Sequence, residues 1–255
     1  MEPIRVVALD LDGTLIDQHS KVASQTIDHL HKLGLRGVTV VLVTGRPFEA
    51  AVEILADNGL GASTGVPQYL ICEERDIYAL DQAEYTPWIE RNTELYNTEK
   101  ALLEQARAIA SQLSESAPQF AFSINEPAAQ EKRGFVELRC SDSLTARRIL
   151  VELHNHLDDS SLHAVRNGRW IALRSRLAGK DKALAALIEH LEVPTQAVLV
   201  MGDSQNDVEM LKAFFPATTN NADAEVKTVV RQQGGIISAS DSSLGVAEVL
   251  TQIFD

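Results

Sequence analysis

Short apolar segments that end in clusters of polar residues recur along this chain, and they limit its possible folds more than any other feature. Residues 4–9, 38–43 and 197–201 are almost entirely apolar and rich in β-branched side chains, as strands buried on both faces are. Helical spacing of apolar residues follows the first two segments, at residues 24–33 and 48–55. Strands that alternate with helices predict βαβ units. We therefore expect an α/β protein with a Rossmann-like, doubly wound parallel sheet.

The pattern changes in the middle of the chain. Short segments there alternate between apolar and polar residues, and Asn167-Gly168 is a favourable dipeptide for a two-residue hairpin turn. Hairpins with one exposed face are typical of an antiparallel sheet backed by helices. The sequence therefore predicts an inserted α+β cap domain over residues 84–174, within a core formed by residues 1–83 and 175–255.

The net charge of the chain is −13, from 23 Lys and Arg against 36 Asp and Glu. Such a surface repels nucleic acids and anionic membranes, so neither is an expected partner. The two cysteines, Cys72 and Cys140, have no CxxC neighbour, which argues against a disulfide framework or a cysteine zinc site. The apolar run at the N-terminus is shorter than a signal segment, and no stretch approaches the ~20 apolar residues of a membrane span. We expect a cytoplasmic protein; its oligomeric state stays open.

Polar clusters follow the predicted strands directly. Ligands of an open parallel sheet bind beyond the carboxyl ends of its strands, so side chains at these ends should gather around one site. Lys180 lies just before the helix that leads into the last strand. The three clusters are Asp10-Leu11-Asp12-Gly13-Thr14, Thr44-Gly45-Arg46 and Gly202-Asp203-Ser204-Gln205-Asn206-Asp207.

Four aspartates belong to these clusters, namely Asp10, Asp12, Asp203 and Asp207. Like charges in one cleft cannot all remain ionised without a cation. Oxygen ligands beside a phosphorylated substrate suit Mg²⁺, whereas zinc prefers His and Cys, which these clusters lack. The sequence therefore predicts a Mg²⁺ site to which these four residues contribute.

The same clusters contain the groups that phosphoryl transfer requires. Attack by the carboxylate of Asp10 would divide hydrolysis into two easier steps. Asp12 can act as general acid towards the leaving alkoxide and then as general base towards water. Lys180, Thr44 and the N–H group of Gly45 are candidates to bind the phosphate and to stabilise its developing charge.

In their order and separation these clusters resemble the four motifs of the haloacid dehalogenase superfamily. The lysine motif is Lys180 with Ala183-Leu184 after it, and the insert falls between the second and third motifs. An insert at this place resembles the C2-cap, Cof-type branch, which includes sugar phosphatases. The resemblance implies a magnesium-dependent phosphatase that forms an aspartyl-phosphate on a small substrate.

The resemblance also implies roles for single residues. Asp10 is similar to the nucleophile and a metal ligand, and Asp12 to the acid/base, with its backbone carbonyl on the metal. Asp203 resembles the metal carboxylate, and Asp207 the residue that supports the metal shell or Lys180. Residues that resemble phosphate or site contacts are Thr44, Gly45, Lys180, Asn206 and Asn221.

Several positions keep alternatives open. Lys182 is the fallback for Lys180, because the motif lysine is followed here by a second one. Arg46 is a candidate phosphate ligand, but it can equally pair with a nearby acid. Many relatives carry Asn-Gly-Ala after the third strand, where this chain has Cys72-Glu73-Glu74-Arg75-Asp76, so no substrate contact is carried over there. In the insert, the polar residues that can either select a substrate or be exposed strand-face charges are Arg133, Arg139, His163 and Arg166.

A phosphomonoester hydrolase acting on a small phosphorylated metabolite is the leading hypothesis. A phosphomutase of the phosphomannomutase type is the alternative, because the same clusters could pass the phosphate to a sugar instead of water. A non-catalytic phospho-ligand binder is disfavoured by the presence of both Asp10 and Asp12. Release of phosphate without a bisphosphate activator separates the first two hypotheses.

Overall fold

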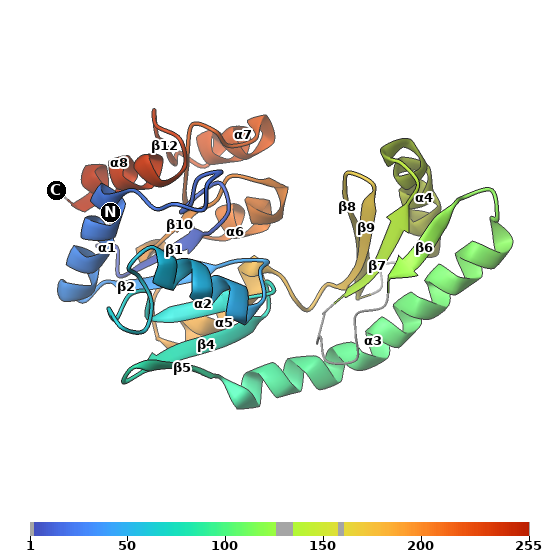
Figure 1. Cartoon of the computed structure of the whole chain (residues 1–255), viewed down its shortest axis with the longest axis horizontal. Coiled ribbons are helices and arrows are strands. Elements are labelled where there is room, and N and C mark those ends of the chain that lie inside the picture. The colour runs from blue at the N-terminus through green and yellow to red at the C-terminus, as the bar shows by residue number, and fades with distance from the viewer. Residues whose placement is uncertain (1–2, 126–134, 158–160, 255) are drawn as a thin grey trace. The chain divides into compact units, whose positions relative to one another are not determined.

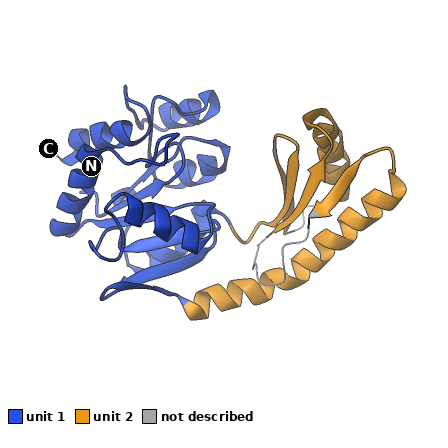
Figure 2. Cartoon of the chain, viewed as in Figure 1, with its two compact units in different colours: residues 1–88, 179–255 blue, residues 89–178 orange. Residues whose placement is uncertain are grey.

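The computed structural model describes residues 3–125, 135–157 and 161–254. The chain divides into two compact units, one formed by Met1–Trp88 with Gly179–Asp255 and the other by Ile89–Ala178 (Figure 2). The sequence predicts divisions after residue 83 and before residue 175, a few residues earlier than those of the units. The first unit carries all the clusters described above.

An eight-stranded sheet forms the centre of the first unit (Figure 1). Its order is β12-β11-β10-β1-β2-β3-β4-β5, and every pair from β12 to β3 is parallel. Only β4 and β5 run antiparallel to their neighbours, at one edge. A mainly parallel sheet confirms the predicted α/β class. The strands are β1 (Val6–Asp10), β2 (Thr39–Val43), β3 (Tyr69–Cys72), β4 (Asp76–Asp81), β5 (Glu84–Pro87), β10 (Val198–Met201), β11 (Phe215–Thr218) and β12 (Ile236–Ile237).

Helices cover both faces of this sheet, which is why β1 is buried along its whole length. One face of the sheet is covered by α1 (Ser24–Leu35), α2 (Phe48–Asp57) and α8 (Ser242–Phe254), and the other by α5 (Lys180–His190), α6 (Val208–Ala213) and α7 (Ala224–Gln232). Alternate residues of β1 enter the two cores: Val7 and Leu9 pack with α1, α2 and α8, and Val6 and Ala8 pack with α5, α6 and α7. Two short 3₁₀ helices are η1 (Thr195–Ala197) and η2 (Gln205–Asp207).

From β1 the chain proceeds in one direction across the sheet, to β2 and then β3. Later it returns to β10, on the other side of β1, and proceeds in the opposite direction to β11 and β12. Parallel crossovers are nearly always right-handed, so progress in opposite directions places the connecting helices on opposite faces. β1 therefore stands where the strand order reverses. Crevices that bind ligands open at this point in doubly wound sheets, beyond the carboxyl ends of the strands.

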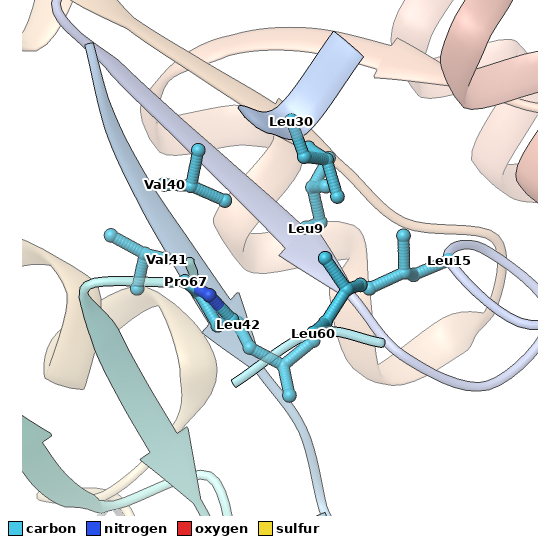
Figure 3. Close-up of a pocket in the computed structure, with 8 residues that line it drawn as sticks. All are labelled: Leu9, Leu15, Leu30, Val40, Val41, Leu42, Leu60 and Pro67. Carbon is cyan, nitrogen blue, oxygen red and sulfur yellow. The ribbon is translucent and has the colours of Figure 1, made fainter. Parts of the chain in front are cut away.

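A small apolar pocket lies within the first unit, lined by side chains of β1, β2, α1 and nearby loops (Figure 3). Its lining side chains carry no hydrogen-bond donor or acceptor, so it offers nothing to a phosphorylated ligand. The residues that line it are Leu9, Leu15, Leu30, Val40, Val41, Leu42, Leu60 and Pro67.

The second unit is an antiparallel sheet in the order β6-β7-β9-β8, with α3 and α4 packed on one face. The hairpin turn between β8 and β9 differs from the prediction. Asn167 pairs with Trp170, so Gly168 and Arg169 form the turn instead of Asn167-Gly168. Gly168 has a φ of +55°, a conformation that glycine adopts without strain. The elements are α3 (Ile89–Ser116), β6 (Phe122–Asn125), β7 (Phe135–Cys140), α4 (Ser143–His156), β8 (Leu162–Asn167) and β9 (Trp170–Ser175).

None of the helices among the described residues combines the length and the apolar content needed to cross a membrane. The 28-residue α3 is long enough, but charged side chains recur along it.

Candidate active site

Three neighbouring strands bring the predicted residues to one edge of the sheet. β1 ends at Asp10, and Thr44 follows β2 directly. On the other side of β1, β10 ends at Met201, two residues before Asp203. Because β10, β1 and β2 are parallel, their carboxyl ends meet at the same edge, as the sequence pattern predicts.

Lys180 lies at the centre of this edge. Its Nζ donates to Asp10 Oδ1 at 2.5 Å and to Asp207 Oδ1 at 2.6 Å. All three side chains are buried, so the two ion pairs are shielded from solvent. Lys180 is the first residue of α5, which places it beside the carboxyl ends of the strands. Lys182, the fallback, instead has a half-exposed side chain that lies 3.6 Å from Asp181 Oδ2.

The turn after β10 orients Asp207. Its Oδ2 accepts from the backbone N–H groups of Asp203 and Ser204, at 3.1 and 3.0 Å. The Ser204 hydroxyl completes a capping box at the start of η2. Together with Lys180, these donors occupy both carboxylate oxygens of Asp207. Asp207 therefore supports Lys180 and the turn.

Burial dominates the electrostatics of the site. It raises the pKa of Asp10, and the neighbouring carboxylates of Asp207 and Asp203 add to the rise, against the lowering effect of Lys180. Burial also raises the pKa of Asp203 to about 6, with Asp207 contributing in the same direction. Burial lowers the pKa of Lys180, but Asp10, Asp207 and Glu74 outweigh it, so this pKa lies above its ordinary value. One ammonium thus faces an excess of negative charge, which a divalent cation would balance.

The donor set fits Mg²⁺. Oxygen atoms of Asp10, Asp203 and Asp207 lie within 4.8 Å of one another, and these ligands are carboxylates, as Mg²⁺ prefers. Among the described residues, hydrogen bonds engage one oxygen of Asp10, through Lys180, and one of Asp203, through the Thr14 hydroxyl at 3.2 Å. The other oxygen of each remains for a metal. The carboxylate of Asp12 is not part of this group.

Gly13 allows the loop after β1 to approach Asp203. Its φ is +80°, and a Cβ atom at this position would clash with the Asp203 carboxylate. Asn221 supports the same loop, because its Nδ2 donates to Gly13 O at 2.8 Å and its Oδ1 accepts from Ser242 N at 2.6 Å. Asn221 therefore joins the loop that follows Asp10 to the start of α8.

Arg46 pairs with Asp12. The guanidinium donates from Nε to Asp12 Oδ2 at 2.8 Å and from Nη2 to Oδ1 at 2.6 Å. Of the two alternatives for Arg46, the structure displays the ion pair with a nearby acid. Both side chains are substantially exposed, so the pair is accessible to an incoming anion.

The turn before α2 holds Thr44 and Gly45. Thr44 is buried, and its Oγ1 accepts from Arg46 N at 3.1 Å. A Cβ atom on Gly45 would lie 3.3 Å from Glu74 Oε1, so Glu74 is in contact with this turn. Thr44 and Gly45 follow β2, which is the strand beside the one that carries Asp10.

Glu74 is the site residue that the sequence analysis does not identify. Its Oε1 accepts from Asn206 Nδ2 at 2.9 Å, across 132 positions of the chain. One signal was present: Glu74 follows the end of β3, which neighbours β2. The rule that polar residues at parallel strand ends converge therefore applies to it as well.

The candidate residues of the insert belong to the second unit. The Arg139 guanidinium lies 5.3 Å from the centre of the Trp170 ring, a cation–π distance. Arg166 Nη1 donates to Gly168 O at 2.8 Å. His163 lies on β8, and Arg133 is outside the described residues.

Known proteins resemble this chain along nearly its whole length. The model of the haloacid dehalogenase-like hydrolases matches residues 7–250. The phosphoglycolate phosphatase of Methanothermobacter thermautotrophicus is 24% identical over 253 residues, 97% of each chain. The HMP-PP phosphatase of Klebsiella pneumoniae is 22% identical over 219 residues, covering 81% of this chain and 80% of its own.

Solved structures agree with the fold. The sucrose-phosphatase of Synechocystis sp. PCC6803, solved with sucrose and phosphate, superposes with a TM-score of 0.71 at 19% sequence identity. The superposition covers 99% of this chain and 98% of that one. The family match spans both segments of the first unit and the insert between them. The chain therefore belongs to the haloacid dehalogenase-like hydrolase family.

Proposed function

We propose that this protein is a magnesium-dependent phosphatase that hydrolyses a small phosphomonoester through an aspartyl-phosphate on Asp10. The observation that carries this proposal is the contact of Lys180 with both Asp10 and Asp207, beside Asp203. This contact brings the ammonium of Lys180 to the buried carboxylate of Asp10, at the edge of the sheet where Asp10 and Asp203 offer carboxylates suited to Mg²⁺. When bound there, Mg²⁺ would neutralise negative charge on the phosphate and orient it.

In the first step, an oxygen of the Asp10 carboxylate attacks phosphorus, and the bond from phosphorus to the ester oxygen breaks. Asp12, in its protonated form, gives a proton to the leaving alkoxide. Lys180 donates to Asp10 Oδ1 and so fixes the direction of this carboxylate in the buried site. Thr44 and the Gly45 N–H would donate to the phosphoryl oxygens, whose charge is greatest in the transition state.

In the second step, Asp12 takes a proton from water while the water oxygen attacks phosphorus. The bond between phosphorus and Asp10 then breaks, and inorganic phosphate leaves with the Asp10 carboxylate restored. Arg46 holds Asp12 in a bidentate pair, so at least one of these two hydrogen bonds has to open before Asp12 can carry the proton that it gives to the alkoxide.

The substrate belongs to the class of small phosphorylated metabolites. Named relatives include phosphatases of phosphoglycolate and HMP-PP, and the sucrose-phosphatase shares the fold. We propose that residues 89–178, which form a separate unit, are the cap that selects the substrate and limits the access of water.

A phosphate-release screen tests the proposal. The purified chain with Mg²⁺ is assayed on p-nitrophenyl phosphate, sugar phosphates, phosphoglycolate and nucleoside monophosphates, with Asp10→Asn as the matched control. We expect release of phosphate by the wild type and none by the variant. Acid quenching during turnover should add the mass of one phosphoryl group to the peptide that contains Asp10.

Other outcomes distinguish the alternatives. Transfer of phosphate between positions of a sugar, without net release, would identify a phosphomutase. Binding of the phosphorylated compounds without either reaction would identify a phospho-ligand-binding protein and would refute the proposed activity.

A further inference from the structure

We propose that Glu74 is a positioning residue, which orients the amide of Asn206 so that its N–H group faces the bound phosphate. This inference rests on the proposed function, because Asn206 contacts a phosphate only if the chain binds a phosphorylated substrate, as its resemblance to the haloacid dehalogenase superfamily implies. It concerns a residue at which the chain departs from the Asn-Gly-Ala pattern of many relatives.

The backbone of Glu74 connects two parts of the site. Its N–H donates to Thr44 O at 2.9 Å, and its carbonyl accepts from Gly179 N at 3.1 Å. Thr44 belongs to the turn after β2, and Gly179 is the residue before Lys180 and α5. Glu74 has a φ of +60°, so it holds this bridging place in a left-handed conformation that few side chains favour.

The side chain of Glu74 contacts a third part of the site, the turn after β10. Glu74 is 7% exposed, and its Oε1 accepts from Asn206 Nδ2 at 2.9 Å. The same oxygen packs against Gly45, as the distance of 3.3 Å from a Cβ atom at that glycine shows. One residue therefore contacts the turn after β2, the start of α5 and the turn after β10.

The chemistry of the two partners fixes the direction of the Asn206 amide. A carboxylate has no hydrogen to donate, so the amide must turn its NH₂ group towards Glu74. On the opposite side, the Ser204 hydroxyl donates to Asn206 Oδ1 at 2.5 Å. The hydroxyl could also accept from a flipped NH₂ group, but a flip would set the amide oxygen against the Glu74 carboxylate, so Glu74 is the partner that fixes the direction. The second hydrogen of Asn206 Nδ2 has no partner among the described residues, so it can donate to a phosphoryl oxygen, whereas a flipped amide would present its oxygen to the anion and repel it.

The negative charge of a carboxylate near a phosphate site repels the phosphate and weakens its binding, and this effect makes the proposal testable. If Glu74 acted only through its charge, removing that charge would strengthen the binding of phosphate. If Glu74 orients Asn206, removing it weakens binding, because the donor is no longer held. The two roles predict changes of opposite sign.

Kinetics on Glu74→Ala, Glu74→Gln, Asn206→Ala and the double variant of Glu74→Ala with Asn206→Ala would decide between them. We expect Glu74→Ala to raise the KM of the best substrate of the screen about tenfold, the scale of one lost charge-assisted hydrogen bond. Its kcat should change less than about threefold. Glu74→Gln keeps an acceptor of the same length and should recover part of the loss.

The kinetics of the double variant distinguish a role of Glu74 through Asn206 from a merely structural role of Glu74. If Glu74 acts through Asn206, the double variant should match Asn206→Ala, because the amide that Glu74 orients is already gone. Glu73→Gln is the matched control: it removes the same charge one residue earlier and should leave kcat and KM at wild-type values. Thermal unfolding of each variant checks that the protein folds.

Calorimetric binding of inorganic phosphate in the presence of Mg²⁺ gives a second measurement that does not depend on turnover. We expect Glu74→Ala to weaken this binding about tenfold as well. Equal or tighter binding by Glu74→Ala, additive effects in the double variant, or the same change in Glu73→Gln would each overturn the inference.

These two measurements separate the inference from the proposed function. If the wild type binds phosphate but hydrolyses no ester, the proposed function fails and the binding series still tests Glu74. If the wild type is active and Glu74→Ala behaves as Glu73→Gln does, only the inference fails. If the wild type neither binds phosphate nor hydrolyses an ester, both are refuted.

Discussion

Lys180 Nζ lies 2.5 Å from Asp10 Oδ1, although the two residues are 170 positions apart in the chain. The pair is buried, and Asp207 holds the same ammonium from the other side. Removing one partner of a buried ion pair leaves an uncompensated charge, which costs much more than an exposed pair is worth. This relationship therefore links the stability of the site to its chemistry.

Asp10→Asn should abolish turnover, because an amide does not replace the carboxylate nucleophile. We expect kcat to fall at least ~10³-fold in a phosphate-release assay with Mg²⁺. The fold should persist, since Asp207 remains to neutralise Lys180. Circular dichroism and thermal unfolding check the fold. Activity above a few percent of the wild type would remove Asp10 as the nucleophile.

Lys180→Met should destabilise the protein and remove its activity. The change leaves Asp10 and Asp207 without their shared cation, and we expect the free energy of unfolding to fall by about 3 kcal/mol. Turnover should fall ~10²-fold or more. Denaturant titration and steady-state kinetics measure the two effects.

Lys182→Met is the matched control for this variant. Its side chain is 51% exposed and faces Asp181, so stability and turnover should stay at wild-type values. If Lys182→Met lost activity while Lys180→Met kept it, the assignment of the motif lysine would be reversed.

Excess chelator should remove the activity, and added Mg²⁺ should restore it. If Mg²⁺ binds the folded chain through Asp10 and Asp203, as proposed, saturating metal should also raise the melting temperature by several degrees, equivalent to about 2.7 kcal/mol at a concentration of 100 Kd. Asp203→Asn should lose most of this thermal shift. Glu209→Gln, at a surface ion pair with Lys212, should keep it. Full activity in chelator would contradict the role of the metal.

Glu248 should make stability depend on pH at the acidic end. Its Oε1 accepts from Ala239 N at 2.9 Å and its Oε2 from Ser240 N at 3.1 Å. These backbone donors, that of Ala239 above all, lower the pKa of Glu248 below its ordinary value of 4.5. A lowered pKa stabilises the folded protein at pH values above 4.5, and this contribution is lost as the pH falls through the folded-state pKa.

Thermal unfolding of Glu248→Gln across pH 3 to 8 tests this linkage. We expect a melting temperature below that of the wild type at neutral pH, and a difference that shrinks as the pH falls below 4.5. A difference that stays constant over the whole range would show that the ionised carboxylate contributes nothing.

The sequence alone predicts the α/β class and the gathering of Asp10, Thr44 and Asp203 at one edge of the sheet. Both depend on local features, because apolar periodicity defines the strands and polar residues mark their ends. Parallel pairing then brings those ends together without further information. The doubly wound sheet and the family are confirmed.

Other details could not be predicted from the chain locally. The dipeptide Asn167-Gly168 suits a hairpin turn, but the register of β8 and β9 is set by which side chains enter the core, and that register places the turn at Gly168 and Arg169. The antiparallel strands β4 and β5 are partly to largely exposed, so they lack the apolar run that marks β1.

What the sequence by itself determined is therefore the sheet, and the edge of that sheet where the candidate site residues gather. Only the tertiary structure decided that Lys180, and not Lys182, joins Asp10, that Arg46 pairs with Asp12, and that Glu74 holds Asn206. Strand periodicity is a property of neighbouring residues. The contacts of a buried side chain depend on how distant segments pack, and no local pattern contains that information.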